Sequence, residues 1–348
     1  MKSPFSWDAY SDQPAVLNDK AYKKKMRQKQ WLDYVKTFVS ALGILPVAIL
    51  AMKWLRKPKI GLFDIGLCVN FDKSDAQYAL VEELGVKHLH YRFPLWEMDK
   101  LEEYVRFLKR FGADKSYVVC ILQDREHIEN PDILAKDITR VFEAFSSFVR
   151  EFQIGNAINR AKWGFFSTGE YLAFFQHIQT IKTNFFPHLV LLGPSVIDFE
   201  YHYTVRALFN AYAVHFDKHA SLLYVDRRGA PSNKQLGFNT ASKIDLLYAL
   251  CTLSPKSSNE IYITEVNWPL SNTAPYAPTS EKECVSEETY ASYLYEYIQT
   301  AKNSGKIRKL FWHQLIAPGY GLVDNREGNI RKMAAFYRFK EVIHENLH

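Results

Sequence analysis

The sequence EIYITEVNWPL, residues 260–270, places a carboxylate directly after a short apolar run. The run Ile261–Ile263 consists of the β-branched and aromatic residue types that favour a buried strand. It is followed by Glu265 and then by an aromatic-proline turn that begins at Trp268. We therefore expect Glu265 at the C-terminal tip of a strand, with an exposed Trp268 beside it.

Seven further strand-like runs alternate with helical patterns along the chain. The runs cover residues 60–69, 88–93, 117–122, 152–155, 189–193, 221–225 and 310–315. The helical patterns cover residues 74–84, 100–111, 131–148, 168–183, 205–213, 241–252, 287–303 and 331–344. Eight strand–helix units predict the α/β class and a (β/α)₈ TIM barrel over residues 59–348.

A doubly wound open sheet is the structural alternative. That fold would carry a glycine-rich phosphate loop after its first strand. The first strand here leads instead into residues 70–73, Asn-Phe-Asp-Lys. The barrel is therefore the favoured architecture.

Composition limits the classes of function. A chain of 348 residues with 47% hydrophobic residues can bury a large core, and α/β barrels of this size form one domain. The net charge of +6 comes largely from residues 20–36, so we expect no nucleic-acid-binding surface. The four cysteines lack the spacing of zinc or redox motifs, and we expect neither a metal nor a cofactor.

The N-terminal segment differs from the rest of the chain. Residues 1–36 form a polar and then basic N-terminal tail, and we expect its first part, residues 1 to about 19, to be loose. Residues 37–55 form an apolar run between basic flanks, which is short for the roughly 20 residues of a membrane span. Three interpretations stay open: a single-pass anchor, a helix lying in the membrane interface, and a soluble helix packed on the barrel.

The flanks of this run suggest an orientation. It is no cleavable signal peptide, because it starts too late and lacks a cleavage site. If it spans a membrane, its more basic N-terminal side stays cytoplasmic and the barrel faces outward. The alternative is a peripheral protein on the cytoplasmic face.

Polar and aromatic residues gather at the ends of the predicted strands, where a barrel places its chemistry. The candidates, in chain order, are Arg92, Asn156, Asn159, Trp163, Tyr224, Asp226, Glu265, Trp268 and Trp312. We expect these side chains to line one cleft.

The arrangement resembles the retaining glycoside hydrolases of clan A, the barrel superfamily that includes β-xylosidases and polysaccharide-locus glycosidases. The resemblance covers about residues 60–345. In that clan the seventh strand ends in the nucleophilic Glu, often as Thr-Glu followed closely by an aromatic. The resemblance implies that Glu265 is the nucleophile, that Asn156 binds the sugar 2-hydroxyl and that Trp312 floors the sugar subsite.

Further roles follow from the same resemblance. Arg92 matches the arginine that commonly supports the nucleophile, and Tyr224 lies where a tyrosine or histidine of the sixth strand often lies. The remaining candidates for substrate contact are Asn159, Trp163, Asp226 and Trp268. The implied ligand is a carbohydrate.

Ala157 departs from the family pattern, because the family has its acid/base Glu at this position. A retaining mechanism uses two carboxyl groups about 5–5.5 Å apart, one to attack and one to protonate the leaving oxygen. A methyl group transfers no proton, and general acid catalysis contributes roughly 10²–10⁴-fold. Hydrolysis of ordinary glycosides should therefore be severely slowed.

Four explanations for Ala157 remain open. The chain is a pseudoenzyme that keeps a sugar cleft, or a transglycosidase whose donor has a leaving group, such as phosphate, that needs no proton. Alternatively, another carboxyl supplies the proton, or the alanine is an engineered knock-out. Candidates for that other carboxyl are Asp124, Asp198 and Asp226. The predicted function is thus a glycoside hydrolase-like protein that acts on or binds a cell-envelope polysaccharide or glycolipid, or else a non-catalytic carbohydrate-binding or assembly protein.

Overall fold

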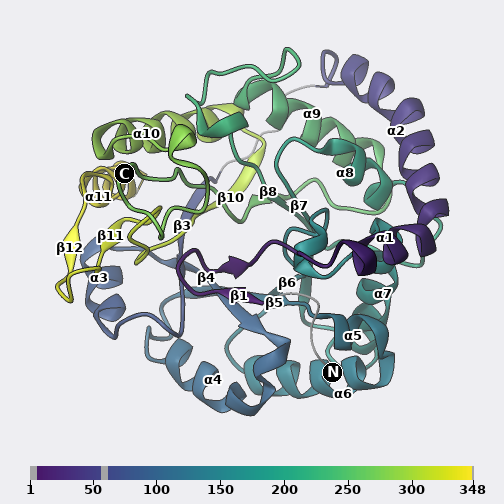
Figure 1. The fold of residues 1–348 in the computed structure, drawn as a ribbon, viewed down its shortest axis with the longest axis horizontal. Coiled ribbons are helices and arrows are strands. Elements are labelled where there is room, and N and C mark those ends of the chain that lie inside the picture. Colours follow the sequence, from purple (N-terminus) through teal and green to yellow (C-terminus); the bar gives the residue numbers. More distant parts are fainter. Residues whose placement is uncertain (1–5, 56–61, 347–348) are drawn as a thin grey trace.

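The computed structural model describes residues 6–55 and 62–346, and its centre is a closed barrel of eight parallel strands (Figure 1). The strands are β3 (Asp64–Val69), β4 (His88–Pro94), β5 (Ser116–Leu122), β6 (Glu151–Ile154), β7 (Val190–Ile197), β8 (Lys218–Leu222), β9 (Ile261–Ile263) and β10 (Ile307–Trp312). Consecutive strands are neighbours, and β10 closes the ring against β3. The predicted (β/α)₈ barrel is confirmed.

Helices follow the strands and surround the barrel (Figure 1). The outer helices are α3 (Ala76–Leu84), α4 (Leu101–Lys109), α6 (Pro131–Phe145), α7 (Thr168–Phe185), α8 (Tyr201–Leu208), α9 (Thr240–Leu253), α10 (Glu287–Ser304) and α11 (Ala334–Asn346). A short α5 (Arg125–Glu129) precedes α6, and β11 (Val323–Asp324) pairs with β12 (Arg331–Lys332). Residues 60 and 61 of the first predicted strand lie outside the described residues.

Capping residues set the ends of several helices. The side chains of Ser167, Asn239 and Ser286 each accept a hydrogen bond from the backbone N–H three residues later, at the starts of α7, α9 and α10. Gly85 and Gly305 end α3 and α10 in the left-handed conformation, with φ of 70° and 65°. These local signals explain why the sequence predicts most helix ends closely.

Two strands begin three residues earlier than predicted, because basic residues in them look like loop residues in the sequence. Lys218 and Lys309 instead lie in the barrel wall and bind the partly buried Glu151 at 2.8 and 3.0 Å. The Tyr262 hydroxyl donates to the same carboxylate at 2.8 Å. Burial alone would raise the pKa of Glu151, but the two lysines and Tyr262 outweigh it and hold the pKa below its usual value.

The expectation of a loose N-terminal tail is wrong for residues 6–19. The strands β1 (Trp7–Asp8) and β2 (Gln13–Pro14) pair as a hairpin that crosses the middle of the ring of strands (Figure 1). Asp12, between them, is buried, and its backbone carbonyl accepts a hydrogen bond from Arg92 at 3.0 Å. The hairpin therefore covers the mouth of the barrel at the C-terminal ends of the strands.

Two helices, α1 (Lys20–Lys29) and α2 (Trp31–Ala51), connect this hairpin to the barrel. The apolar helix begins at Trp31, before the predicted start at residue 37. The charged residues Asp33 and Lys36 lie outside the apolar run of the sequence, but they belong to the helix. Asp33 is buried: its Oδ1 accepts from Arg206 of α8 at 2.6 Å, and its Oδ2 from the Gly169 N–H of α7 at 2.8 Å. These contacts hold α2 along the outside of the barrel.

The opposite face of α2 is apolar and exposed. Its exposed large hydrophobic residues are Trp31, Leu32, Val35, Phe38, Val39, Leu42, Val47 and Leu50. Among the described residues, α2 is long and apolar enough to cross a membrane, by length and composition. The basic residues 56, 57 and 59, which flank the predicted anchor, lie outside the described residues.

We predict that Glu151→Gln lowers the free energy of unfolding by about 3 kcal/mol, because it leaves the buried Lys309 and the partly buried Lys218 without their shared carboxylate. The contribution of a carboxylate with a lowered folded-state pKa is present above the unfolded value and is lost as pH falls through the folded value. Urea unfolding at neutral and acidic pH should therefore show the difference shrinking in acid.

A matched control is available for this variant. Glu260 pairs with the same Lys218 at 3.1 Å, but its side chain is 52% exposed. Glu260→Gln should cost less than about 1 kcal/mol. Equal losses in the two variants would show that burial of the Glu151 cluster does not stabilise the barrel.

Candidate functional site

Glu265 follows β9 at the C-terminal face of the barrel and is buried. Its Oε1 accepts a hydrogen bond from the Tyr224 hydroxyl at 2.5 Å, and its Oε2 forms an ion pair with Arg92. The Asn156 amide lies 3.5 Å from the same Oε2. The structure thus brings together four residues that the sequence predicts to form the site.

The surroundings of Glu265 keep its carboxylate ionised. Burial alone would raise the pKa of Glu265, but charge interactions with His313 and Arg92 and hydrogen bonds from Tyr224 and Arg92 lower it to about 2. Burial also holds the pKa of His313 well below its usual range. His313 is therefore neutral at neutral pH, and Arg92 is the cation beside Glu265.

A cavity of about 200 Å³ adjoins Glu265. Of the predicted residues, Arg92, Trp163, Asp198, Tyr224 and Glu265 line it. Arg160, Arg228 and His313 also line it, and sequence reasoning missed the remaining lining residues, Ser11, Asp12, Gln13, Lys162, Ile197, Asn267, Pro278, Thr279 and Tyr320. The cavity is a polar pocket at the face where barrels carry their chemistry.

The N-terminal hairpin supplies one wall of this cavity. The Asp12 carboxylate accepts from the Tyr320 hydroxyl at 3.0 Å and pairs with Lys73 at 3.0 Å. Burial raises the pKa of Asp12, against the opposing effect of Lys73. Trp7 packs its ring edge on Trp163, with centroids 5.9 Å apart. Aromatic residues within the polar tail are the one sequence signal that could have pointed to this contact.

Two of the three tryptophans expected to contact sugar are completely buried instead. Trp268 and Trp312 stack on each other, with ring centroids 6.0 Å apart, and neither lines the cavity. The Trp268 indole donates to the Gly229 carbonyl at 3.0 Å, and that of Trp312 to the Tyr290 hydroxyl at 2.7 Å. The expectation of an exposed Trp268 is wrong, because the turn after β9 folds back onto α10. The role of Trp312 as a subsite floor stays a prediction.

Asn159 and Asp226 also lie away from this cavity. The Asn159 amide donates to Glu200 at 2.8 Å and to the Ile197 carbonyl at 3.0 Å, so it braces two loops. Asp226 begins a short turn and lines neither this cavity nor a larger one beside α1. Contact of either residue with a substrate remains a prediction.

Ala157 is buried within the main hydrophobic core and does not line the cavity. Its backbone is left-handed, with φ of 45°. Among the carboxyls considered as substitutes, Asp198 lines the cavity and pairs with Arg160 at 2.6 Å. Asp124 instead caps α5 and binds His127 at 2.8 Å. The cavity thus contains Asp198 and Asp12 besides Glu265.

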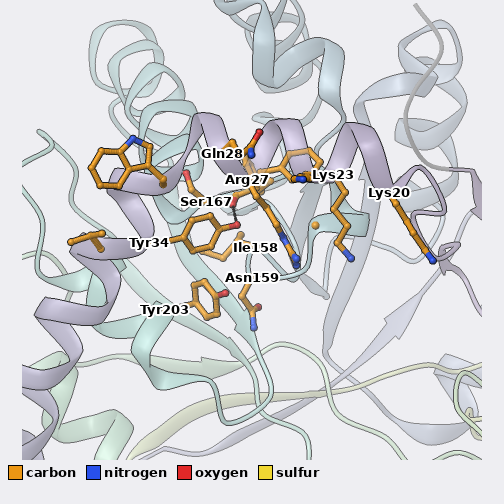
Figure 2. A pocket seen from close by; sticks show the side chains of 15 residues that line it. Lys20, Lys23, Arg27, Gln28, Tyr34, Ile158, Asn159, Ser167 and Tyr203 are labelled. Atoms are coloured by element: carbon orange, nitrogen blue, oxygen red, sulfur yellow. Dashed lines mark hydrogen bonds between the residues drawn. The ribbon is translucent and has the colours of Figure 1, made fainter.

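A second, larger cavity of about 820 Å³ lies between α1, the start of α2 and the loop after β6 (Figure 2). Lys20, Lys23 and Arg27 project from α1 toward the loop that carries Asn159 (Figure 2). Lys24 also lines this cavity. In the part of the chain that the structure describes, no carboxylate is within ion-pair distance of these four cations. The same described residues hold no cluster of three His, Cys, Asp or Glu side chains suited to a metal ion.

No protein-family model and no curated protein sequence matches the chain, but solved structures of glycoside hydrolases resemble it. A β-glucosidase from Thermotoga maritima, in complex with deoxynojirimycin, has a TM-score of 0.57 at 12% identity, over 84% of this chain and 99% of its own. A family 39 glycoside hydrolase from Bacteroides cellulosilyticus WH2 also has a TM-score of 0.57 at 12% identity, over 80% and 63% of the two chains. This likeness shows the barrel fold.

We predict that Arg92→Gln raises the pKa of Glu265 from about 2 by roughly 1–3 units, because it removes the adjacent cation. The carboxyl resonances of ¹³C-labelled glutamate, followed through an NMR titration, would measure the change. Tyr224→Phe should shift the pKa in the same direction by removing a hydrogen bond to the anion.

Lys73→Gln serves as the control, because Lys73 contacts Asp12 and not Glu265. This variant should leave the Glu265 titration nearly unchanged. An unaltered pKa in both Arg92→Gln and Tyr224→Phe would contradict the assigned cause of the low value.

Proposed function

We propose that the protein acts on a carbohydrate of the cell envelope, with Glu265 as the nucleophile. The observation that carries this proposal is an ionised carboxylate at the end of β9, oriented by Arg92, Tyr224 and Asn156 and facing a polar cavity. The likeness to β-glucosidases supports the choice of a glycoside as substrate.

In the proposed reaction, a Glu265 oxygen attacks the anomeric carbon, and the bond from that carbon to the leaving oxygen breaks. The leaving group departs with the bonding electron pair, and an ester joins the sugar to Glu265. Water or another hydroxyl then attacks the same carbon, loses its proton and frees the carboxylate.

The acidity of the leaving group determines which glycosyl donors the site can use. Ala157 is buried and cannot provide a proton, so alkoxide leaving groups are disfavoured. A donor with an acidic leaving group, such as phosphate, fits this site better, and transfer to a hydroxyl acceptor fits as well as hydrolysis. The second candidate function, favoured by the same alanine, is a carbohydrate-binding protein without turnover.

We predict that an activated 2-deoxy-2-fluoroglycosyl fluoride labels the protein covalently at Glu265, because fluoride leaves without protonation. Peptide mass spectrometry would locate the label. Glu265→Gln should abolish labelling, whereas Glu260→Gln should retain it. Since the pKa of Glu265 is about 2, ionisation of the nucleophile should not limit labelling between about pH 4 and about pH 8. Failure to label across a broad sugar panel would favour the binding protein.

We further propose that α1 and α2 attach the protein to an anionic membrane surface. The exposed apolar residues of α2 form one face, and an apolar face of this size marks a contact with a protein or a membrane. The unpaired cations of α1 adjoin the start of that face (Figure 2). A basic patch beside an apolar helix face is typical of helices that lie in the interface.

An interfacial position fits the contacts of α2 better than a spanning one. Asp33 is tied to Arg206 and to the Gly169 N–H, so a helix that left the barrel would carry an unpaired carboxylate with it. A charge at the bilayer centre costs about 2.5–3.5 kcal/mol or more. The proposed arrangement keeps the ion pair and immerses only the outer face.

We predict that the protein cosediments with vesicles containing phosphatidylglycerol more strongly than with phosphatidylcholine vesicles. Phe38→Ser with Leu42→Ser should weaken binding to both, whereas Lys23→Glu with Lys24→Glu should remove the preference for the anionic lipid. Tyr337→Ser, an exposed aromatic on α11, is the control. Protein in cell membranes that resisted alkaline carbonate extraction would contradict the interfacial position and support a span.

A further inference from the structure

Two cations that line the Glu265 cavity form no ion pair with a carboxylate of the described residues. Each carboxylate that lines it already has a cation: Glu265 has Arg92, Asp198 has Arg160, and Asp12 has Lys73. Two lining cations remain, and these are Lys162 and Arg228. Neither forms an ion pair within residues 6–55 and 62–346.

The contacts of these two cations direct them at the cavity. The Lys162 ammonium donates to the Gln13 side chain of the hairpin at 2.6 Å, and the Arg228 guanidinium lies 3.6 Å from the ring centre of Tyr224. Nη1 of Arg228 is buried, with no hydrogen-bond partner in the described parts of the chain. Its neighbour Arg227 is exposed and does not line the cavity.

Other polar atoms of the lining are buried and unpartnered in the same way. They are Arg92 Nε, His313 Nδ1 and Thr279 Oγ1. Buried polar atoms in folded proteins are nearly always hydrogen-bonded to protein, water or ligand. The lining therefore suits a compact ligand rich in hydroxyls that also carries negative charge.

We propose that the sugar bound beside Glu265 is an acidic monosaccharide unit, whose carboxylate binds Arg228 and Lys162. This inference rests on the proposed carbohydrate function and names its substrate class. A carboxylate presents two oxygens in one plane, which match the planar fork of a guanidinium. A neutral sugar would leave both cations in the cavity without a direct ion-pair partner, a costly state for partly buried groups.

The size of the cavity adds a second restriction. Its volume of about 200 Å³ lies below the roughly 300–1,000 Å³ of pockets that hold drug-sized ligands. The hairpin closes one side through Ser11, Asp12 and Gln13. The site therefore takes one terminal sugar unit, so the acidic residue is the end of its chain or the glycosyl group of an activated donor.

The test compares sugars that differ only in the acidic group. Titration calorimetry of the full chain with glucuronate against glucose, and with galacturonate against galactose, would give matched pairs. We expect at least one acid to bind about tenfold or more tightly than its neutral partner. The difference should shrink as salt rises, since screening weakens charge pairing.

Adjacent arginines provide the variant and its control. Arg228→Gln should bring the affinity for the acid to the level of the neutral sugar, whereas Arg227→Gln should leave it unchanged. Lys162→Gln should also weaken binding of the acid. Agreement between the two variants would exclude misfolding of one variant as the cause.

Neutral sugars that bind as well as the acids would overturn the acidic specificity and leave the carbohydrate function standing. The same holds if Glu265 is labelled by neutral fluorosugars alone. If none of the four sugars binds and no fluorosugar labels Glu265, both proposals are overturned. Glucose 6-phosphate binding tightly where the acids do not would replace the carboxylate by a phosphate as the recognised group.

Discussion

Arg92 connects the parts of this protein that matter for its chemistry. From the end of β4, its guanidinium pairs with Glu265 and donates to the backbone carbonyl of Asp12. The charge of a buried arginine needs a nearby anion, and the hairpin carbonyl accepts from the same guanidinium, so the anion at the end of β9 and the N-terminal hairpin depend on the same side chain. The ionisation of Glu265, the closed cavity and the position of the hairpin all depend on one buried cation.

The barrel could be predicted from the sequence because its signals are local. Apolar runs, capping residues and glycine stops lie within a few residues of the elements that they define, as with Ser167 at α7 and Gly305 after α10. The errors occur where a distant partner decides the structure. Lys218 and Lys309 lie in strands because Glu151 neutralises them, and no local pattern contains that information.

The site was predictable to the extent that barrel geometry brings strand ends together. Glu265, Arg92, Asn156 and Tyr224 meet because each follows a strand of the same ring or lies near the end of one. Trp268 and Trp312 show the limit, since an aromatic side chain at a strand end can turn into the core as readily as into a cleft. The position of the hairpin residues could not be predicted from the sequence, because it depends on distant contacts such as that of Asp12 with Tyr320.

The hairpin has a consequence for how the chain is handled. Residues 11–13 form a wall of the cavity, and α1 begins only a few residues later at Lys20. A protein shortened at the N-terminus to improve solubility would keep its barrel but present an open groove in place of a closed pocket. Binding measured on such a shortened protein would describe a site with a different shape from that of the intact chain.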